Sequence, residues 1–217
     1  MRYGRLTHCR VAGASTGSVT MNWMIYYLCK NPTIKARTIS ELEAMFPDNL
    51  NGKEPLPFTK LNKIRLLEHA EIECLRLHPP IGYAMPRDTP PQGAVISGIY
   101  IPGGVAVGVP AATIGRNPAV YPNPDRFDPE RWSDEGEQGS SNEKTIQQDV
   151  AMAKACFLGF GYGSRQCIGR SLATQFITKM IATLLLKYEI QLEDPQLVLG
   201  TKAVSYTHLT LPTKRIV

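Results

Sequence analysis

The segment "FGYGSRQCIG", residues 160–169, gathers the side chains of this sequence that are best suited to chemistry. It sets Cys167 and Arg165 among glycines, at the edge of an apolar stretch with helical spacing. A loop of this composition could hold a phosphate, a metal ion, a disulfide or a haem. The residues around the loop decide among these possibilities.

Two nucleotide-binding patterns fail at this loop. Gly161 and Gly163 are followed by Ser164, Arg165 and Gln166, so the third glycine of G-x-G-x-x-G is missing, and no Gly-Lys-Ser/Thr is present for a P-loop. A reactive cysteine stays possible, because the first turn of a helix stabilises a thiolate. That interpretation lacks a nearby base, since the histidines of the chain are His8, His69, His78 and His208.

A haem bound through a thiolate uses every special residue of the loop. Such a thiolate needs backbone N–H donors, glycines that let the loop lie against the porphyrin, and a cation for the propionates. Cys167 supplies the ligand, Gly163 and Gly169 allow close approach, Arg165 supplies the cation, and Phe160 shields the sulfur. The loop therefore predicts a haem-thiolate site.

Composition excludes several other classes of protein. The 217 residues are 43% hydrophobic, which is enough for a buried core, and carry a formal net charge of +5. The basic residues are spread along the chain without a cluster, so we expect no nucleic-acid partner. The five cysteines are scattered and form no C-x-x-C pair, which argues against a disulfide framework. We also expect no signal peptide and no membrane anchor in this chain.

The elements around the loop are predicted to be mostly helical. Apolar spacing indicates helices over residues 11–29 and 61–77, with a helical patch at 39–46. The stretch "GAVISGIYIPGGVAVGV" predicts a hairpin or two short strands, and 133–144 is expected to be an exposed loop. A long helix should follow the glycine loop, with one apolar face formed by Ile168, Leu172, Phe176, Met180 and Leu184.

At every fixed position, the pattern Phe160-x-x-Gly163-x-Arg165-x-Cys167-x-Gly169 resembles the haem-thiolate loop of the cytochrome P-450 monooxygenases. The resemblance covers roughly residues 10–195 and is most similar to fungal members. It implies that Cys167 is the axial ligand of the haem iron. The fold class it implies is mainly α with a small β region, the C-terminal part of the cytochrome P-450 fold.

Three further matches come in the order that the family has them, and Arg87 is a fourth similarity. Glu73-x-x-Arg76 resembles its buried Glu-Arg pair, and Arg131 in "FDPERW" resembles the arginine that completes this structural charge network. "AGAST", which ends at Thr16, resembles the distal helix that crosses the haem, and implies that Thr16 helps to deliver protons. Arg87 in "AMPRDT" lies where members commonly place another propionate-binding arginine.

The resemblance implies insertion of one atom of O₂ into a small apolar substrate, with electrons from an NADPH-dependent cytochrome reductase. It divides the chain into an uncertain start at 1–9, a partial haem domain at 10–195 and a tail of doubtful origin at 196–217. The intact parent is expected at the cytosolic face of the endoplasmic reticulum membrane. We expect the fragment alone to be inactive.

Two departures from the family pattern leave alternatives open. Ser15 stands where an acidic residue is common, and Gly17 stands where a second hydroxyl is frequent. The change at Ser15 motivates one alternative, a haem-thiolate enzyme that needs no reductase, such as a peroxygenase or an isomerase. The other alternative, a non-catalytic haem-binding remnant or pseudogene product, is motivated by the partial haem domain and by the tail at 196–217.

Overall fold

The computed structural model describes residues 3–49, 54–133 and 150–200, with side chains from residue 12 onward. Its longest element is α1 (Tyr3–Lys30), which extends the predicted helix at 11–29 toward the N-terminus. Asn31 ends α1 by donating a side-chain hydrogen bond to the Tyr27 carbonyl, 2.8 Å away. Pro32 then begins α2 (Pro32–Met45), because its fixed φ suits the first turn of a helix.

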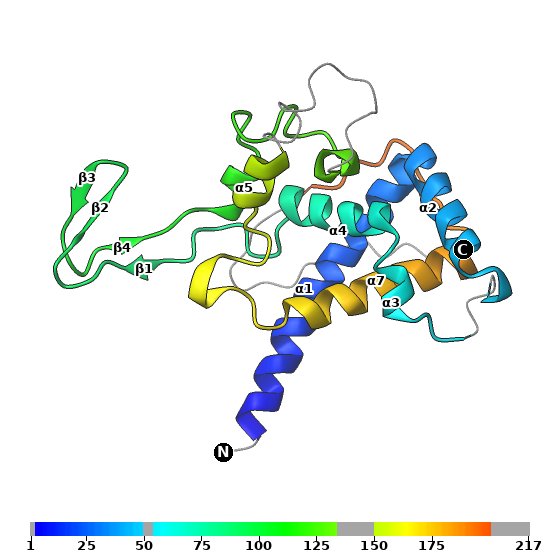
Figure 1. The fold of residues 1–217 in the computed structure, drawn as a ribbon, viewed down its shortest axis with the longest axis horizontal. Helices are drawn as coiled ribbons and strands as arrows, with labels where there is room; N and C mark the ends of the chain where they lie inside the picture. Colours follow the sequence, from blue (N-terminus) through cyan, green and yellow to red (C-terminus); the bar gives the residue numbers. More distant parts are fainter. Residues whose placement is uncertain (1–2, 50–53, 134–149, 201–217) are drawn as a thin grey trace.

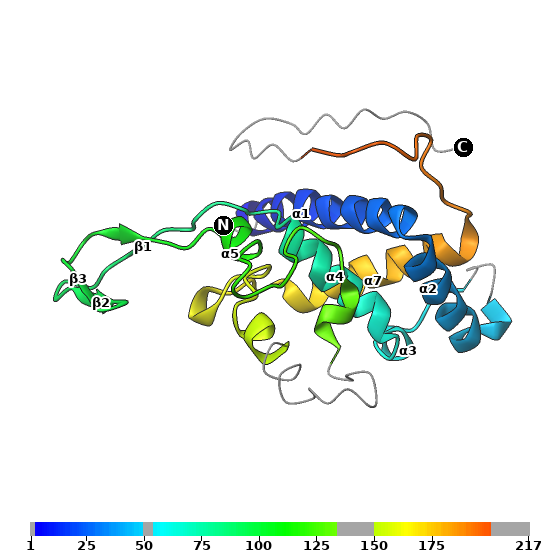
Figure 2. The same cartoon turned by 90° about the horizontal axis from the view of Figure 1, so that it is seen from above.

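Helices α1, α4 (Arg65–Leu77) and α7 (Arg170–Lys187) form the centre of the molecule. Figure 2 shows α1 lying across both α4 and α7, which also pack against each other. The turn η1 (Pro47–Asn49) follows α2, and the short α3 (Phe58–Leu61) packs against α7. The main core between these elements includes Met24, Leu28, Leu42, Leu61, Leu67, Ala70, Ile177 and Ile181.

The small β region forms an arm that projects from the helices (Figure 1). Strand β1 (Arg87–Asp88) pairs antiparallel with β4 (Ala106–Val107), and β2 (Ala94–Ile96) pairs with β3 (Ile99–Ile101). Ser97 and Gly98 join β2 to β3 with φ values of 50° and 81°, as a two-residue hairpin turn requires. The predicted hairpin is therefore confirmed.

The connection from the arm to the glycine loop is mostly irregular. It contains α5 (Ala111–Ile114), the turn η2 (Pro129–Trp132) and a helical segment at 150–155. A second, smaller core forms there from Tyr121, Trp132 and Ala153. Most of the loop predicted at 133–144 lies outside the described residues. The turn η3 (Gly163–Arg165) then leads into α7.

Helix α7 has the predicted length, but the predicted apolar stripe is not its buried face. Ile168, just before the helix, and Leu172 are 105% and 75% exposed, and Phe176 and Met180 are also exposed. The buried positions are Ile177, Thr178, Ile181, Ala182 and Leu185. Because α7 is apolar on more than one side, spacing alone could not show which side packs against α1 and α4.

No helix among the described parts of the chain combines the length and the apolar character that crossing a membrane requires.

Candidate functional site

The glycine loop presents Cys167 at the protein surface, directly before α7. The Cys167 backbone N–H donates to the Phe160 carbonyl at 2.8 Å, and the Arg170 N–H donates to the Cys167 carbonyl at 3.3 Å. Gly161 and Gly163 have φ values of 74° and 70°, the left-handed region in which glycine is favoured. The glycines therefore turn the chain so that the thiol of Cys167 is exposed.

Gly169 needs a different explanation, because its φ of −87° is open to any residue. A methyl group added at Gly169 would meet only the Cys167 Sγ, at 3.9 Å. The missing side chain thus leaves open space beside the sulfur. Together with the exposed Tyr162 and Ile168, this space fits a flat, apolar group bound through one thiolate.

The two other predicted haem-binding side chains of the loop, those of Arg165 and Phe160, differ in exposure. Arg165, in η3, is exposed, and Phe160 is half-buried with the Arg170 guanidinium 5.5 Å from its ring centroid. Within the described ranges, no three His, Cys, Asp or Glu side chains form a cluster that could bind a metal ion. A haem-thiolate site needs only one protein ligand, so Cys167 suffices as the donor.

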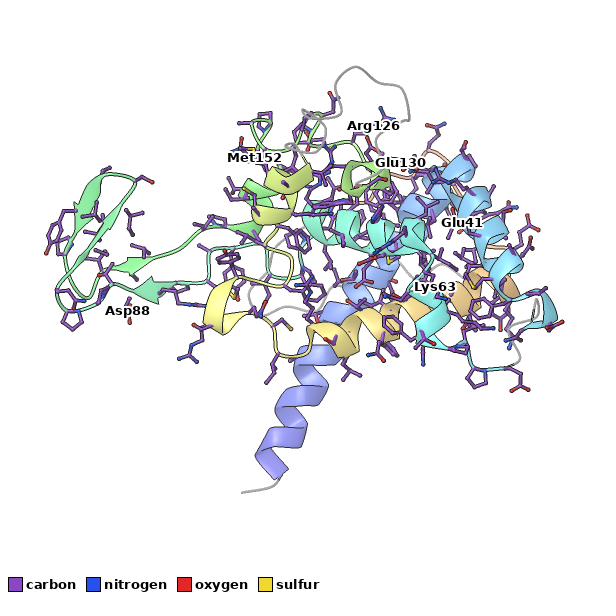
Figure 3. The ribbon with its side chains drawn as sticks, in the orientation of Figure 1. Glu41, Lys63, Asp88, Arg126, Glu130 and Met152 are labelled. Carbon is purple, nitrogen blue, oxygen red and sulfur yellow. The ribbon has the colours of Figure 1, made fainter. Side chains whose placement is uncertain are left out.

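Two predicted site residues lie on other elements. Thr16, on α1, is half-buried, and its hydroxyl donates to the Ala12 carbonyl at 2.6 Å. Arg87 is exposed in the arm and donates to the Pro86 carbonyl at 2.9 Å. Figure 3 shows its neighbour Asp88 far from the helices. The roles of Thr16 and Arg87 at a haem stay predictions.

The structure brings Glu73, Arg76 and Arg131 together in the interior. The Arg76 guanidinium donates to both carboxylate oxygens of Glu73, at 2.8 and 2.7 Å, and both side chains are almost fully buried. Arg131 reaches the same carboxylate at 3.5 Å. The other Arg76 hydrogens go to the carbonyls of Gly115, Pro124 and Arg126. A two-point pair of this kind fixes orientation as well as charge.

Sequence reasoning missed two further donors to Glu73. The Trp132 indole Nε1 donates at 2.9 Å, and the Asp128 backbone N–H donates at 3.0 Å. The signal was available, since a tryptophan next to Arg131 in "FDPERW" needs a partner for its N–H when it is buried. Nearby, Arg37 of α2 pairs with Glu41 and Glu130, which Figure 3 shows on neighbouring elements.

Sequence reasoning also missed an aromatic cluster at the end of α4. The His78 ring stacks on Trp23 with a centroid distance of 3.4 Å, and its Nε2 hydrogen-bonds the Tyr27 hydroxyl at 2.8 Å. Burial, aided by Arg116 and Arg76, lowers the pKa of His78 to about 3. Burial likewise raises the pKa of Tyr27 to about 12. Both groups are therefore neutral at ordinary pH, which suits a packing role.

Comparison with known proteins decides the family. The family model described as cytochrome P-450 matches residues 6–216. The chain belongs to the cytochrome P-450 family. Its curated relatives include fungal enzymes described as cytochrome P-450 monooxygenases, so the predicted family and its fungal character are confirmed.

The cytochrome P-450 relatives are identical to this chain at about a third of the aligned positions. A monooxygenase named orf2 from Aspergillus niger is 34% identical over 176 residues, covering 81% of this chain and 32% of its own length. One named poxM from Penicillium oxalicum is 31% identical over 83% of this chain and 32% of its own length. One named eupD from Phoma sp is 31% identical over 82% of this chain and 56% of its own length. The chain thus spans about a third of the length of the first relatives it matches.

Proposed function

We propose that this chain is the haem-binding portion of a monooxygenase and that Cys167 is the axial ligand. The observation that carries the proposal is the open space beside the exposed Cys167 sulfur, at a glycine whose backbone does not require glycine. A side chain at Gly169 would enter this space beside the sulfur. Haem bound through a thiolate supplies the activation of O₂ for transfer of one oxygen atom to an organic substrate.

The chain's own residues would hold the group in place. Phe160 fixes the Cys167 backbone through its carbonyl, and Gly161 and Gly163 turn the thiol outward. Arg165 and Arg87 would pair with the propionates, although they lie on separate elements. Glu73, Arg76 and Arg131 would keep α4 and η2 in a fixed relation to each other.

The finer parts of the proposal rest on the family. They are an NADPH-dependent cytochrome reductase as electron donor, O₂ and a small apolar substrate as reactants, and a parent protein at the endoplasmic reticulum membrane. Thr16 would help to deliver protons for the reaction. Its hydroxyl already has an acceptor within α1, the Ala12 carbonyl, so its hydrogen is directed along the helix.

The test is titration of the purified chain with haem. The haem is then reduced, carbon monoxide is added, and the absorption spectrum is recorded. We expect the spectrum of a thiolate ligand, and we expect Cys167→His to replace it with that of an imidazole ligand. Cys156→Ala is the matched control, because Cys156 is a free, half-buried thiol outside the loop. A thiolate spectrum that survives in Cys167→Ala would show that the assignment is wrong.

A reductase-independent enzyme is the second candidate, supported by Ser15 in place of a carboxylate before Thr16. The haem-loaded intact parent protein would be assayed with hydrogen peroxide alone and with reductase and NADPH. Turnover with peroxide alone favours the second candidate, and turnover that requires NADPH favours the first.

A further inference from the structure

Helix α4 buries a second carboxyl group, Glu71, which the charge network does not use. Glu73 and Glu71 are both at most 2% exposed, but they have different partners. Glu73 accepts hydrogen bonds from two guanidinium groups, an indole and a backbone N–H. The partners of Glu71 are two hydroxyl groups of α7, Thr174 Oγ1 at 3.0 Å and Thr178 Oγ1 at 3.3 Å.

Hydroxyl partners allow a carboxyl group to take up a proton and still form hydrogen bonds with them, whereas guanidinium partners do not. A guanidinium only donates hydrogen bonds, so it requires an ionised carboxylate. A threonine hydroxyl donates to a carboxylate, and it can also accept from a protonated carboxyl group. Glu71 therefore keeps contact with α7 in both states, but the pattern and strength of its hydrogen bonds differ between them.

The charges around Glu71 do not hold it ionised. Burial raises its pKa to about 7, the two threonines and Arg170 of α7 oppose this shift, and Glu68 of α4 adds to it. Cys74, on the same helix, has a raised pKa of its own. The described side chains of α1 include no acidic group, and its Lys30 donates to the Pro195 carbonyl.

The other charged neighbours of α4 have different partners. Arg131 of η2 contacts Glu73, and Arg116, after α5, pairs with Asp125 at 3.2 Å. His69 lies within the field of Glu68, Glu130 and Lys154, and burial lowers its pKa. Lys60 of α3, which packs on α7, lies over the Phe46 ring.

A continuous set of contacts leads from Glu71 to the glycine loop. Thr174 lies in the second turn of α7. The first turn of α7 is bound to the loop, because the Ala173 N–H donates to the Gly169 carbonyl at 2.8 Å. Arg170, whose charge acts on Glu71, also lies over the ring of Phe160. The carbonyl of Phe160 in turn accepts the Cys167 N–H.

We propose that Glu71 is a positioning residue for the Cys167 loop and that its protonation changes the place of the first turns of α7 through Thr174 and Thr178. The proposal rests on the proposed function only in taking Cys167 to be the haem ligand. When Glu71 is ionised, both hydroxyls donate to it and draw α7 toward α4. When it is protonated, one of these charge-assisted hydrogen bonds is lost or reversed, and the start of α7 relaxes.

The experiment is a pH titration of the purified chain without haem, followed by NMR. The side-chain carboxyl carbons of ¹³C-glutamate report Glu71, and the backbone amides of residues 167–174 report the loop and the first turns of α7. We expect the amides to shift with the same midpoint as the Glu71 carboxyl carbon. Glu71→Gln should abolish the titration of these amides while keeping the side chain's size and a hydrogen-bonding oxygen.

Two further variants separate positioning from simple packing. Thr174→Val together with Thr178→Val keeps the volume of α7 but removes both hydroxyls, so Glu71 should still titrate, at a higher midpoint, while the loop amides cease to follow it. Glu68→Gln removes a negative charge and should lower the midpoint of both signals together. Loop amides that fail to titrate in the wild type, or that titrate equally in Glu71→Gln, would overturn the proposal. Because haem is absent, failure of haem binding does not affect this test.

Discussion

Glu73 is the buried carboxylate on which the α4–η2 contact depends. Its donors come from α4, from η2 and from the segment before η2, so one side chain joins three parts of the chain. Removing one member of such a group leaves the others buried without a partner, which costs more than the pair contributes when it is complete. We therefore expect these residues to act on stability.

The loss of stability on substitution in this group should depend on which hydrogen-bond donor to Glu73 is removed. Arg76→Met should lower the free energy of unfolding by about 3–5 kcal/mol, because it strands a buried carboxylate. Trp132→Phe removes one N–H donor to a charged acceptor and should cost about 2 kcal/mol. Urea unfolding measures both, with Arg65→Met as control, since the exposed Arg65–Glu68 pair is worth less than about 1 kcal/mol. Equal losses in all three variants would contradict this account.

The sequence predicted the charged members of this group but not all of it. Glu73, Arg76 and Arg131 belong to motifs with fixed spacing, so their proximity could be expected. Glu71 could not, because nothing in "EIE" shows that the first glutamate faces α7 and the second faces η2. The facing threonines lie about a hundred residues further along the chain, and only the packed structure brings them to α4.

At the scale of elements, two positions of the glycine loop have glycine for different physical reasons. Gly163 has a φ of 70° and open space around it, so its glycine serves the backbone turn. Gly169 has an ordinary φ, and its glycine leaves space beside Cys167. The two positions therefore respond differently to the same substitution.

Gly163→Ala should destabilise the chain by about 1–2 kcal/mol, because an L-residue is strained in the left-handed region. Gly169→Ala should leave the unfolding free energy nearly unchanged and should weaken haem uptake, since the new methyl group fills the space beside the sulfur. Urea unfolding and haem titration of both variants measure these effects. Full haem uptake by Gly169→Ala would mean that the space is not used.

The elements themselves were largely predictable. Helical spacing and the prolines at 32 and 79 located α1 and the end of α4, and the Ser97–Gly98 turn explains why the hairpin was found. The bounds were less accurate: α2 begins at Pro32 and not at 39, and the helix predicted over 61–77 is divided between α3 and α4. What failed was the burial of α7. Its stripe from Ile168 to Met180 has ideal spacing for a core face, yet it is exposed, because tertiary packing chose the side that carries Ile177 and Ile181.

For the whole molecule, two buried groups, His78 and Glu71, make the free energy of unfolding change with pH in opposite directions. The pKa of His78 falls from 6.5 to about 3 in the folded chain, so its contribution is complete above pH 6.5 and is lost as the pH falls toward 3. The pKa of Glu71 rises from 4.5 to about 7, so its contribution is complete below pH 4.5 and is lost as the pH rises to 7. Between about pH 4.5 and 6.5 the two slopes cancel.

In the Glu71→Gln variant, the pH dependence that His78 gives to the free energy of unfolding should become visible. We expect the free energy of unfolding of this variant to rise by about 1.4 kcal/mol per pH unit between pH 4.5 and 6.5, while the wild type stays nearly level. Urea unfolding at a series of pH values measures both curves, and Glu68→Gln serves as the control, because it keeps Glu71 and should only move the level region slightly toward lower pH. Parallel curves for the wild type and Glu71→Gln would show that Glu71 does not titrate in this range.

The projecting arm has a consequence for how the chain is held together. The arm joins α1 and α4 on one side to η2 and α7 on the other, and these elements pack against each other in the body of the molecule. A protease that cut the exposed backbone after Arg87 would therefore not release either half. The nicked protein would migrate as one particle until denaturant separated two complementary fragments, each of which needs the other for its core.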